Sequence, residues 1–275
     1  MSAIPLQTYD PFPSTFVTPR RVDIWLPPTY DQQPEARFPV LYMHDGQNLF
    51  DSAHAYAGET WGVAEALTEQ AGAGICREGI IVGIWNLNEQ RWGEYMPRRP
   101  LTTPAGQLRL TTLAEKIPEV DAGVLPTSDE YLRFLVEELK PFIDRELRTL
   151  PGPEDTAVIG SSMGGLISLY AVCEYPHIFG RAGCVSTHWP AAGGIVIDYL
   201  QSALPPPGMH KWYFDFGTET LDAQYEPYQK QADEIMAAAG YTRGVDWVTH
   251  TFPGAAHDEP SWRKRVHIPL RFLLK

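Results

Sequence analysis

Short apolar runs alternate with longer amphipathic segments along most of this chain. Residues 38–44 contain a near-continuous apolar run from Val40 to Met43, which is typical of a strand buried on both faces of a sheet. Residues 128–147 instead space their apolar side chains at the period of a helix, and Ser128 provides an N-cap. These patterns predict a hairpin at about 14–26, strands at 38–44, 80–85, 155–160, 181–185, 211–216 and 246–252, and helices at 59–70, 128–147, 163–175, 222–239 and from about 260.

The alternation of buried strands with helices predicts an α/β fold, with a mostly parallel central sheet and helices on both of its faces. In such a sheet ligands bind at the carboxyl ends of the strands, so the loops that follow the strands should carry the chemistry. Residues 87–127 form a long irregular stretch, and we expect there a long loop or lid-like insertion that lines a pocket. Residues 1–275 as a whole are expected to form a single domain.

Composition and charge limit the kinds of partner, cofactor and cellular compartment that we expect for the chain. Its 275 residues are 44% hydrophobic, which is ample for one large core. The formal net charge of −12 repels nucleic-acid phosphates and anionic lipid, so we expect neither a nucleic-acid nor a membrane partner. The first 16 residues lack the basic start and apolar core of a signal peptide, and the three cysteines fit a reducing compartment, so we expect a cytoplasmic protein. The cysteine spacing matches no metal motif, and we expect neither a metal nor a cofactor.

The pattern G-x-S-x-G occurs at residues 160–164, between a predicted strand and a predicted helix. In this pattern a nucleophilic serine lies on a sharp strand-to-helix turn, and glycine is needed at the flanking positions, where a Cβ would collide. We therefore expect Ser162 to be the nucleophile. The alternative is a glycine-rich turn with a solvated serine.

A serine hydroxyl needs a general base, and in chains with this motif the acid and then the histidine follow the serine. His257 lies in a loop of small residues directly after the strand at 246–252, and it is the predicted base. The acid should follow the strand at 211–216, where Asp222 and Glu219 are the candidates. We prefer Asp222, which would fix the tautomer of the imidazole, although Asp222 is also a natural N-cap for the helix that follows.

The strand at 38–44 ends in an abruptly polar segment, HDGQN at 44–48. Acyl transfer needs two N–H donors aimed at the developing oxyanion. One normally comes from the residue after the nucleophile, here Met163, and we predict that the other is the N–H of Gln47 in this segment. A calcium loop is the alternative, but the alternating acidic ligands and the closing Glu of such a loop are absent from the sequence.

Several segments together resemble one known family. They are LYMHDGQNLFD at 41–51, VGIWN at 82–86 with RWGEYMP at 91–97, IGSSMGG at 159–165, VSTHWP at 185–190 and GTETLDAQY at 217–225. In this order they resemble the putative-esterase family of α/β-hydrolases, which includes enterochelin (siderophore), feruloyl and acetylxylan esterases, S-formylglutathione hydrolase and the mycolyltransferases. The resemblance runs from about residue 20 to the end of the chain. It implies an eight-stranded α/β-hydrolase sheet and a metal-free site with Ser162 as nucleophile, His257 as base and Asp222 favoured as acid.

The same resemblance implies that the turn beginning at Arg91 lies beside the mouth of the site, where Arg91 binds an anionic or polar part of the substrate. We group Asp45 and Glu94 with it as predicted substrate-binding residues. An ion pair between Arg91 and Glu94 that only braces the loop is the alternative. Trp85 and Trp189 follow strands at the same edge, where they either pack against an aromatic acyl group or sugar ring, or support the core.

The residues and the resemblance together predict a serine carboxylic-ester hydrolase that forms an acyl-enzyme. The substrate is expected to be a small ester of the siderophore, feruloyl or acetyl type. Three alternatives remain: an acyltransferase with the same triad, a peptidase on the same fold, and a catalytically silent hydrolase scaffold that binds carbohydrate or protein. The sequence makes no prediction about the oligomeric state.

Overall fold

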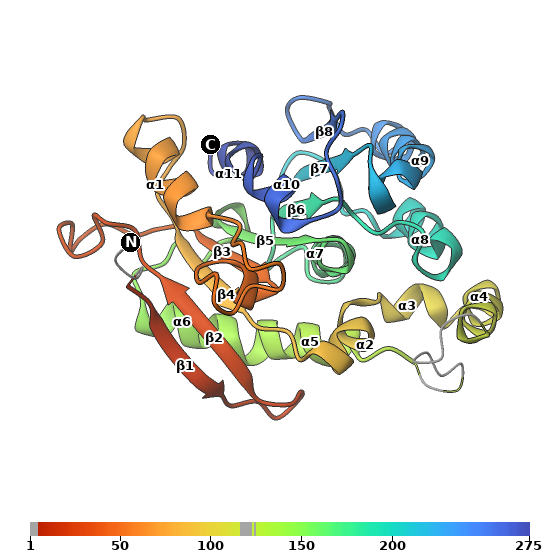
Figure 1. The fold of residues 1–275 in the computed structure, drawn as a ribbon, viewed down its shortest axis with the longest axis horizontal. Coiled ribbons are helices and arrows are strands. Elements are labelled where there is room, and N and C mark those ends of the chain that lie inside the picture. Colours follow the sequence, from red (N-terminus) through yellow and green to blue (C-terminus); the bar gives the residue numbers. More distant parts are fainter. Residues whose placement is uncertain (1–4, 116–122, 124) are drawn as a thin grey trace.

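The structure, a computed structural model, describes residues 5–115, 123 and 125–275. Its centre is an eight-stranded sheet with the strand order β1-β2-β4-β3-β5-β6-β7-β8 (Figure 1). The first two strands pair antiparallel with each other, the second pairs antiparallel with β4, and all remaining pairs are parallel. This mostly parallel sheet with helices on both faces is of the α/β-hydrolase type, which confirms the predicted fold class.

The described residues form the following elements. The strands are β1 (Gln7–Phe12), β2 (Arg20–Trp25), β3 (Val40–His44), β4 (Ile80–Ile84), β5 (Thr156–Ser161), β6 (Arg181–Val185), β7 (Lys211–Gly217) and β8 (Trp247–Phe252). The helices are α1 (Val63–Gly72), α2 (Arg91–Tyr95), α3 (Arg98–Leu101), α4 (Pro104–Ala114), α5 (Ser128–Arg133), α6 (Lys140–Glu146), α7 (Met163–Glu174), α8 (Ile195–Ala203), α9 (Glu226–Ala238), α10 (Glu259–Arg263) and α11 (His267–Leu273). The 3-10 turns used below are η1 (Gly46–Asn48) and η6 (Thr220–Gln224), and the π-helical turn η3 (Phe134–Leu139) joins α5 to α6.

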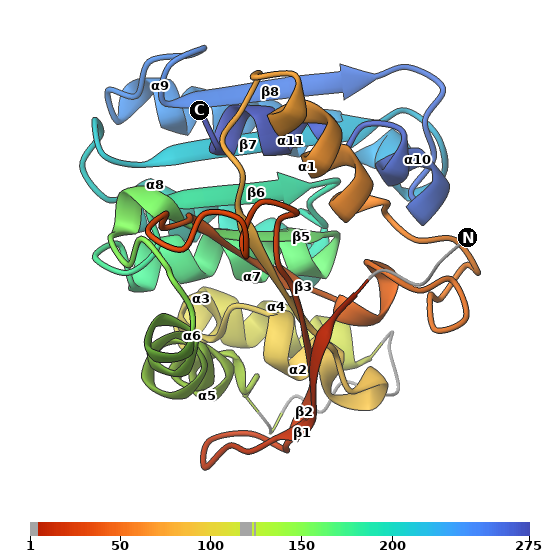
Figure 2. The same cartoon turned by 90° about the vertical axis from the view of Figure 1, so that its left-hand side faces the viewer.

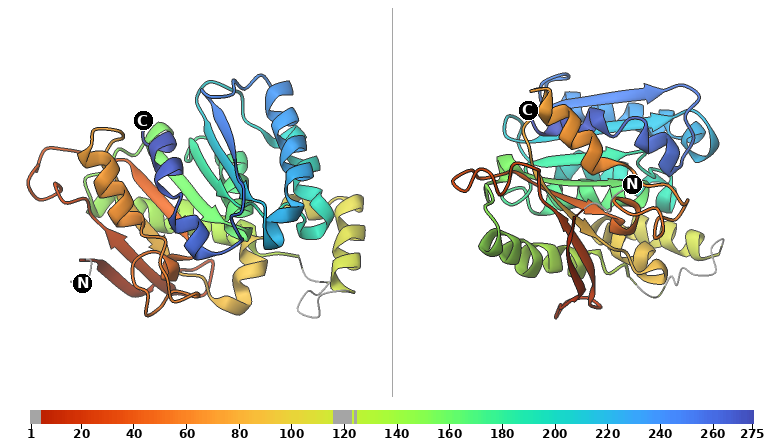
Figure 3. Two further views of the ribbon diagram at one scale, coloured as in Figure 1. Left: turned by 45° about the horizontal axis from the view of Figure 1, so that its top comes forward. Right: turned by 60° about the vertical axis from the view of Figure 1, so that its left-hand side comes forward.

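Two apolar layers enclose the sheet. Successive side chains of a strand point to opposite faces, so Tyr42 of β3 packs in the layer that contains α5 to α9, while Leu41 and Met43 pack against α1 and α11. Figures 1 and 3 show α1 and α11 together on one face of the sheet. Figure 2 shows the parallel strands with their carboxyl ends on one side, where α10 also lies. Chemistry carried by the loops after these strands therefore gathers at one edge.

The predicted strands from residue 38 onward are confirmed to within two residues, but other predictions need correction. The first strand of the hairpin begins at Gln7 rather than near residue 14. The helix α8 was not predicted, and α1 begins at Val63 rather than at residue 59. The helix expected at 222–239 begins at Glu226, because residues 220–224, Asp222 among them, form the 3-10 turn η6.

The stretch from 87 to 127 is not irregular throughout, since its described residues include α2, α3 and α4. The contact between α3 and α4 depends on Gly106, because a Cβ there would lie only 2.2 Å from the carbonyl oxygen of Pro100. Arg109 of α4 also donates to Asp198 of α8 at 3.0 Å, although the two residues are 89 positions apart. Packing between distant residues leaves no periodic signal in the sequence, which explains why the helices were missed. The predicted lid lies partly in residues 116–122 and 124, which are outside the described residues.

Candidate active site

Ser162 lies at the turn between β5 and α7. Its backbone has φ 57° and ψ −120°, a strained conformation for a residue with a side chain, and its N–H donates to the carbonyl of Val185 at 2.9 Å. A Cβ at position 160 would lie 2.6 Å from the carbonyl carbon of Gly164, so glycine is required there. A Cβ on Gly164 itself would meet its nearest neighbours at an ordinary 3.5 Å, which corrects the expectation that both flanking positions exclude a side chain.

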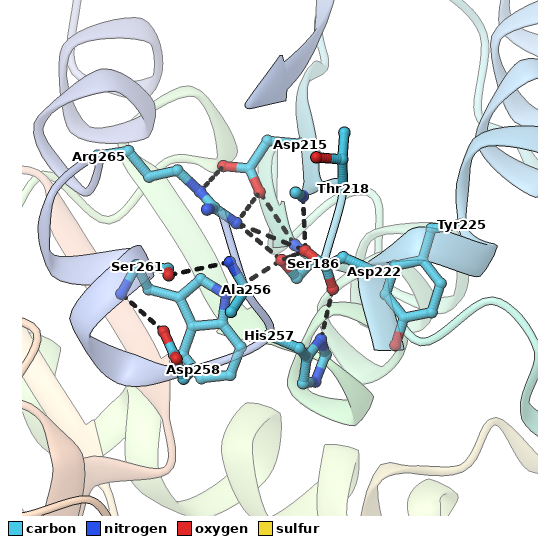
Figure 4. Close-up of polar contacts among 12 residues, drawn as sticks. Ser186, Asp215, Thr218, Asp222, Tyr225, Ala256, His257, Asp258, Ser261 and Arg265 are labelled. Carbon is cyan, nitrogen blue, oxygen red and sulfur yellow. Dashed lines mark hydrogen bonds and ion pairs between the residues drawn. The ribbon is translucent and has the colours of Figure 1, made fainter. Parts of the chain in front are cut away.

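The predicted base and the preferred acid contact each other. Nδ1 of His257 lies 2.5 Å from Oδ1 of Asp222 (Figure 4). The Asp222 side chain is fully buried, whereas the His257 side chain keeps 10% of its surface exposed. Glu219, the other candidate acid, is exposed. The structure therefore brings together Asp222 and His257, and the N-cap alternative for Asp222 does not hold because no side-chain cap bond is formed.

The second oxygen of Asp222 is held by two donors. Oδ2 accepts hydrogen bonds from the Gly217 N–H and the Ser186 hydroxyl, both at 2.6 Å. Burial raises the pKa of Asp222, but the hydrogen bonds from His257, Ser186 and Gly217 lower it by more, and the net pKa lies below the ordinary value. The carboxylate is thus kept ionised beside the imidazole.

Ser186 links this carboxylate to a buried cation. Its oxygen accepts hydrogen bonds from Nε1 of Trp262 at 3.0 Å and from Arg265 at 2.7 Å, so its own hydrogen is left for Asp222. Arg265 is itself paired with Asp215, at 3.1 Å (Figure 4). Sequence reasoning missed Ser186 and Arg265, and the available signal was Asp215, an acidic residue inside an otherwise apolar strand.

His188 and Tyr225 link the turn at Ser162 to the predicted base. The Tyr225 ring stands edge-on to that of His257, with the centroids 5.7 Å apart and the planes at 90°. Nδ1 of His188 lies 2.6 Å from the Tyr225 hydroxyl, and the N–H of His188 donates to the carbonyl of Ser162 at 3.1 Å. A chain of contacts therefore joins the backbone of Ser162 to the ring of His257 at the carboxyl edge of the sheet.

The two predicted oxyanion donors lie on adjacent elements. Met163 is the first residue of α7 and Gln47 lies in η1, and the first N–H groups of a helix have no partner within that helix. Gly46 is packed so closely that a Cβ would lie 2.6 Å from the carbonyl carbon of Gly83. The side chain of Gln47 accepts a hydrogen bond from the N–H of Asn86 at 3.2 Å. The assignment of these donors stays a prediction.

The ion pair between Arg91 and Glu94, the alternative to substrate binding by Arg91, does not form. Arg91 instead donates to both oxygens of Asp45, at 2.8 and 2.7 Å, and 28% of its side chain stays exposed. Glu94 is buried, with 1% of its surface exposed, and pairs with Arg20. Glu94 is thus unavailable to a substrate, because its charge is already satisfied inside the core.

The two candidate substrate-binding tryptophans, Trp85 and Trp189, differ in how deeply they are buried. Trp189 is 1% exposed and donates from Nε1 to Gln229 at 2.9 Å, so it belongs to the core rather than to a binding surface. Trp85 is half-buried and lines a cavity of about 680 Å³ that also contacts Gln47. The polar side chains of this cavity are Arg21, Asp23, Gln47, Asp51, Ser52, His54, Glu59, Thr60, Glu65 and Arg263.

Within residues 5–115, 123 and 125–275, no group of three or more His, Cys, Asp or Glu side chains is arranged to hold a metal ion. Within the same ranges, no helix is long and apolar enough to span a bilayer.

The strand order and the strained serine after β5 place the protein among the α/β-hydrolases. A family model described as putative esterase matches residues 14–268, and the chain therefore belongs to this family. It is a carboxylic ester hydrolase.

Relatives of the chain extend over most of its length. The uncharacterized protein YbbA of Bacillus subtilis (strain 168) is 29% identical over 234 residues, which cover 81% of this chain and 80% of YbbA. The structure of a ferulic acid esterase superposes with a TM-score of 0.69 at 17% identity and covers 98% of both chains. An IroE-like serine hydrolase from Shewanella oneidensis superposes with a TM-score of 0.73 at 20% identity, covering 98% of this chain and 80% of the other.

Proposed function

We propose that the protein hydrolyses a small carboxylic ester through a Ser162–His257–Asp222 triad and an acyl-enzyme. The observation that carries the proposal is the 2.5 Å contact between Nδ1 of His257 and the buried Asp222 carboxylate. The strained backbone and partly exposed position of Ser162, at the turn after β5, support it because they are typical of a hydroxyl nucleophile.

In the first half of the reaction, Oγ of Ser162 attacks the ester carbonyl carbon while Nε2 of His257 takes the hydroxyl proton. The N–H groups of Met163 and Gln47 donate to the oxyanion. His257 then passes its proton to the departing alcohol oxygen as the C–O bond breaks. Asp222 stays ionised and stabilises the imidazolium through Nδ1.

In the second half, a water attacks the acyl carbon and gives a proton to His257. The bond between the acyl carbon and Oγ breaks, Oγ recovers the proton from Nε2, and the carboxylic acid leaves. Every proton taken by His257 is returned, so the cycle needs no metal or cofactor.

A siderophore-, feruloyl- or acetyl-type ester is the proposed substrate. The family and the fold shared with a ferulic acid esterase support this range. The cavity beside Gln47 is polar and includes Trp85, which suits an aromatic or hydroxylated group. Arg91 keeps part of its guanidinium exposed near the site and provides a positive charge for polar substituents.

Labelling with a fluorophosphonate, followed by intact mass and peptide mapping, tests the mechanism. A single adduct on Ser162 is expected, and Ser162→Ala should abolish both the adduct and turnover of p-nitrophenyl acetate. Ser161→Ala is the matched control and should keep the label, because Ser161 is the last residue of β5 and is buried. No adduct on folded protein, or full activity of Ser162→Ala, would contradict the proposal. Rates with methyl ferulate and with a siderophore trilactone then identify the acyl class.

A further inference from the structure

The start of α10 contacts the segment that carries the predicted oxyanion donor. His257 and Asp258 directly precede this helix, whose first residue is Glu259 (Figure 4). Oε1 of Glu259 accepts a hydrogen bond from Nδ2 of Asn48 in η1 at 3.3 Å, although the two residues are 211 positions apart. Asn48 directly follows Gln47 in the sequence. This hydrogen bond therefore joins the segment of the base to the segment of the oxyanion donor.

Asn48 fixes the conformation of η1 through its backbone and side-chain polar groups. Its N–H donates to the carbonyl of Asp45, and its carbonyl accepts from the N–H of Trp61, both at 2.9 Å. Its side-chain oxygen accepts from the N–H of Tyr56, also at 2.9 Å. Its side-chain amide donates to Glu259, and only 7% of Asn48 is exposed. Loss of the Glu259 carboxyl would leave a buried amide without this acceptor, so η1 would have to adjust.

Gln47 lies between two residues that are held by different elements. On one side, Gly46 packs so closely that a Cβ would lie 2.6 Å from the carbonyl carbon of Gly83 in β4. On the other side, the side chain of Asn48 is bonded to α10. The position of the Gln47 N–H therefore depends on both β4 and α10, and α10 is also the helix that follows the predicted base.

The environment of Glu259 favours a role as hydrogen-bond acceptor over a role as charge. Glu259 is 7% exposed, and burial raises its pKa. The carboxylate of Asp222 differs, because its hydrogen bonds hold its pKa below the ordinary value. A carboxyl group accepts a hydrogen bond in either protonation state. The bond to Asn48 therefore does not require a negative charge, and a glutamine amide could accept it as well.

We propose that Glu259 is a positioning residue that, through Asn48, holds the N–H of Gln47 where the oxyanion of the ester forms. The inference rests on the proposed function and on the predicted role of Gln47 in it. The oxyanion forms in both halves of the reaction and is absent from the bound ester, so a displaced donor weakens the transition states alone. Removal of the Glu259 carboxyl should therefore lower kcat and leave KM nearly unchanged.

Steady-state hydrolysis of p-nitrophenyl acetate by two variants of Glu259 tests the role. Glu259→Ala should lower kcat roughly threefold to tenfold, the effect of one hydrogen bond, with KM within about twofold of the wild type. Glu259→Gln is the matched control and should keep kcat within about twofold, because its amide oxygen still accepts from Asn48. An equal loss in both variants would overturn the inference, since the charge would then matter rather than the bond. A raised KM at unchanged kcat would also overturn it.

An exchange of donor and acceptor tests the contact itself. Asn48→Asp should lower kcat at least as much as Glu259→Ala, because two carboxyl groups then face each other. Adding Glu259→Gln to Asn48→Asp reverses the direction of the hydrogen bond and should restore kcat to within about threefold of the wild type. A double variant no faster than Asn48→Asp alone would mean that the two side chains do not act as a pair, and the inference would fail. Urea unfolding checks that each variant is folded.

Inhibition by phenylboronic acid relates the loss in kcat to the oxyanion. The adduct of a boronic acid with a serine is tetrahedral and resembles the transition state of acyl transfer. Glu259→Ala should weaken this inhibition by about the same factor as it lowers kcat/KM, whereas Glu259→Gln should leave the inhibition as in the wild type. Unchanged inhibition of Glu259→Ala together with a lowered kcat would contradict a role in oxyanion binding.

The proposed function and the role of Glu259 fail in different ways. If the fluorophosphonate does not label Ser162 in the wild type, the proposed function fails. If it labels Ser162 while Glu259→Ala hydrolyses the ester with the kcat of the wild type, only the role of Glu259 fails.

Discussion

The carboxylates of Asp222 and Asp45 lie in differently built parts of the same sheet edge. Asp222 is held by His257, Ser186 and the Gly217 N–H, which come from three separate segments, and its side chain is fully buried. Asp45 is held by Arg91, whose side chain is 28% exposed, and by Asn86 at 2.6 Å.

Because of this difference, substitutions near Asp222 and substitutions near Asp45 should have different effects on activity. The hydrogen bonds around Asp222 come from Ser186 directly after β6, from Gly217 of β7 and from the loop before α10, so a change in any of them shifts the orientation of the imidazole. Asp45, the partner of Arg91, directly precedes Gly46 and Gln47, which line the polar cavity. Substitutions there should alter which ester binds while leaving the acid–base pair in place.

The largest expected effect comes from removing the charge of the acid. Asp222→Asn should lower kcat by about 10⁴-fold, because a neutral amide no longer fixes the productive tautomer or stabilises the imidazolium. Glu219→Gln is the matched control and should retain activity, since Glu219 is exposed and Asp222 contacts His257. Steady-state hydrolysis of p-nitrophenyl acetate measures both. A loss seen only in Glu219→Gln would reverse the assignment of the acid.

A smaller effect is expected from Ser186. Ser186→Ala removes one donor to the Asp222 carboxylate and leaves Arg265 without one acceptor. A hydrogen bond to a charged group contributes about 1.5 to 3 kcal/mol, so we expect kcat to fall roughly 10- to 100-fold if that energy is lost in the transition state. Ser261→Ala, in α10 four residues after His257, should leave kcat nearly unchanged, and equal losses in both variants would point to general loosening of this part of the chain.

Local patterns were enough to predict part of this site. Ser162 is fixed by a motif of five residues, and His257 by its place after the last strand, because both follow from the order of elements along the chain. The partner of Arg91 was not predictable in this way. Glu94 is three residues away and at helical spacing, yet the buried Arg20 of β2 binds it and leaves Arg91 to Asp45.

The fold, too, was predictable from local patterns only in part. The strands of the sheet were predictable because each is an apolar run buried on both faces, and β3 is buried at all five positions. The helix α4 carries a Gly and polar residues, and besides its close approach to α3 at Gly106 it is held by the distant α8, where Asp198 accepts from Arg109 at 3.0 Å. Contacts made across the chain, rather than local propensity, decide such elements.

A substitution of Arg91 tests whether the region around Asp45 contributes to substrate binding, to stability or to both. Arg91→Ala should raise KM for an ester that bears a carboxylate relative to a neutral ester by about fivefold or less, as expected for a partly exposed charge. The same variant should lose about 2 kcal/mol of stability, because Asp45 is left buried without its partner. Steady-state kinetics with the two esters and urea unfolding measure the two effects separately.

The double variant Asp45→Ala/Arg91→Ala distinguishes binding from folding. It should recover most of the lost stability, since no charge is left unpaired, while the preference between the two esters stays weakened. If the double variant also regains the wild-type preference, Arg91 acts only by neutralising Asp45, and the proposed contact with substrate is wrong.

A further prediction concerns stability in mild acid. Burial lowers the pKa of His44 to about 3, and burial with the charge of His257 lowers that of His188 to about 4. The unfolded chain takes up these protons near pH 6.5, so between about pH 6.5 and 4 it binds more protons than the folded state. The free energy of unfolding should therefore fall as the pH decreases, by up to about 1.4 kcal/mol per pH unit for each histidine.

Urea unfolding at pH 7, 6 and 5 measures this dependence. His188→Asn should lower the slope by the share of one histidine, because the asparagine takes up no proton in either state. His177→Asn is the matched control at an exposed position and should keep the wild-type slope. A slope that His188→Asn leaves unchanged would mean that His188 is already protonated in the folded protein.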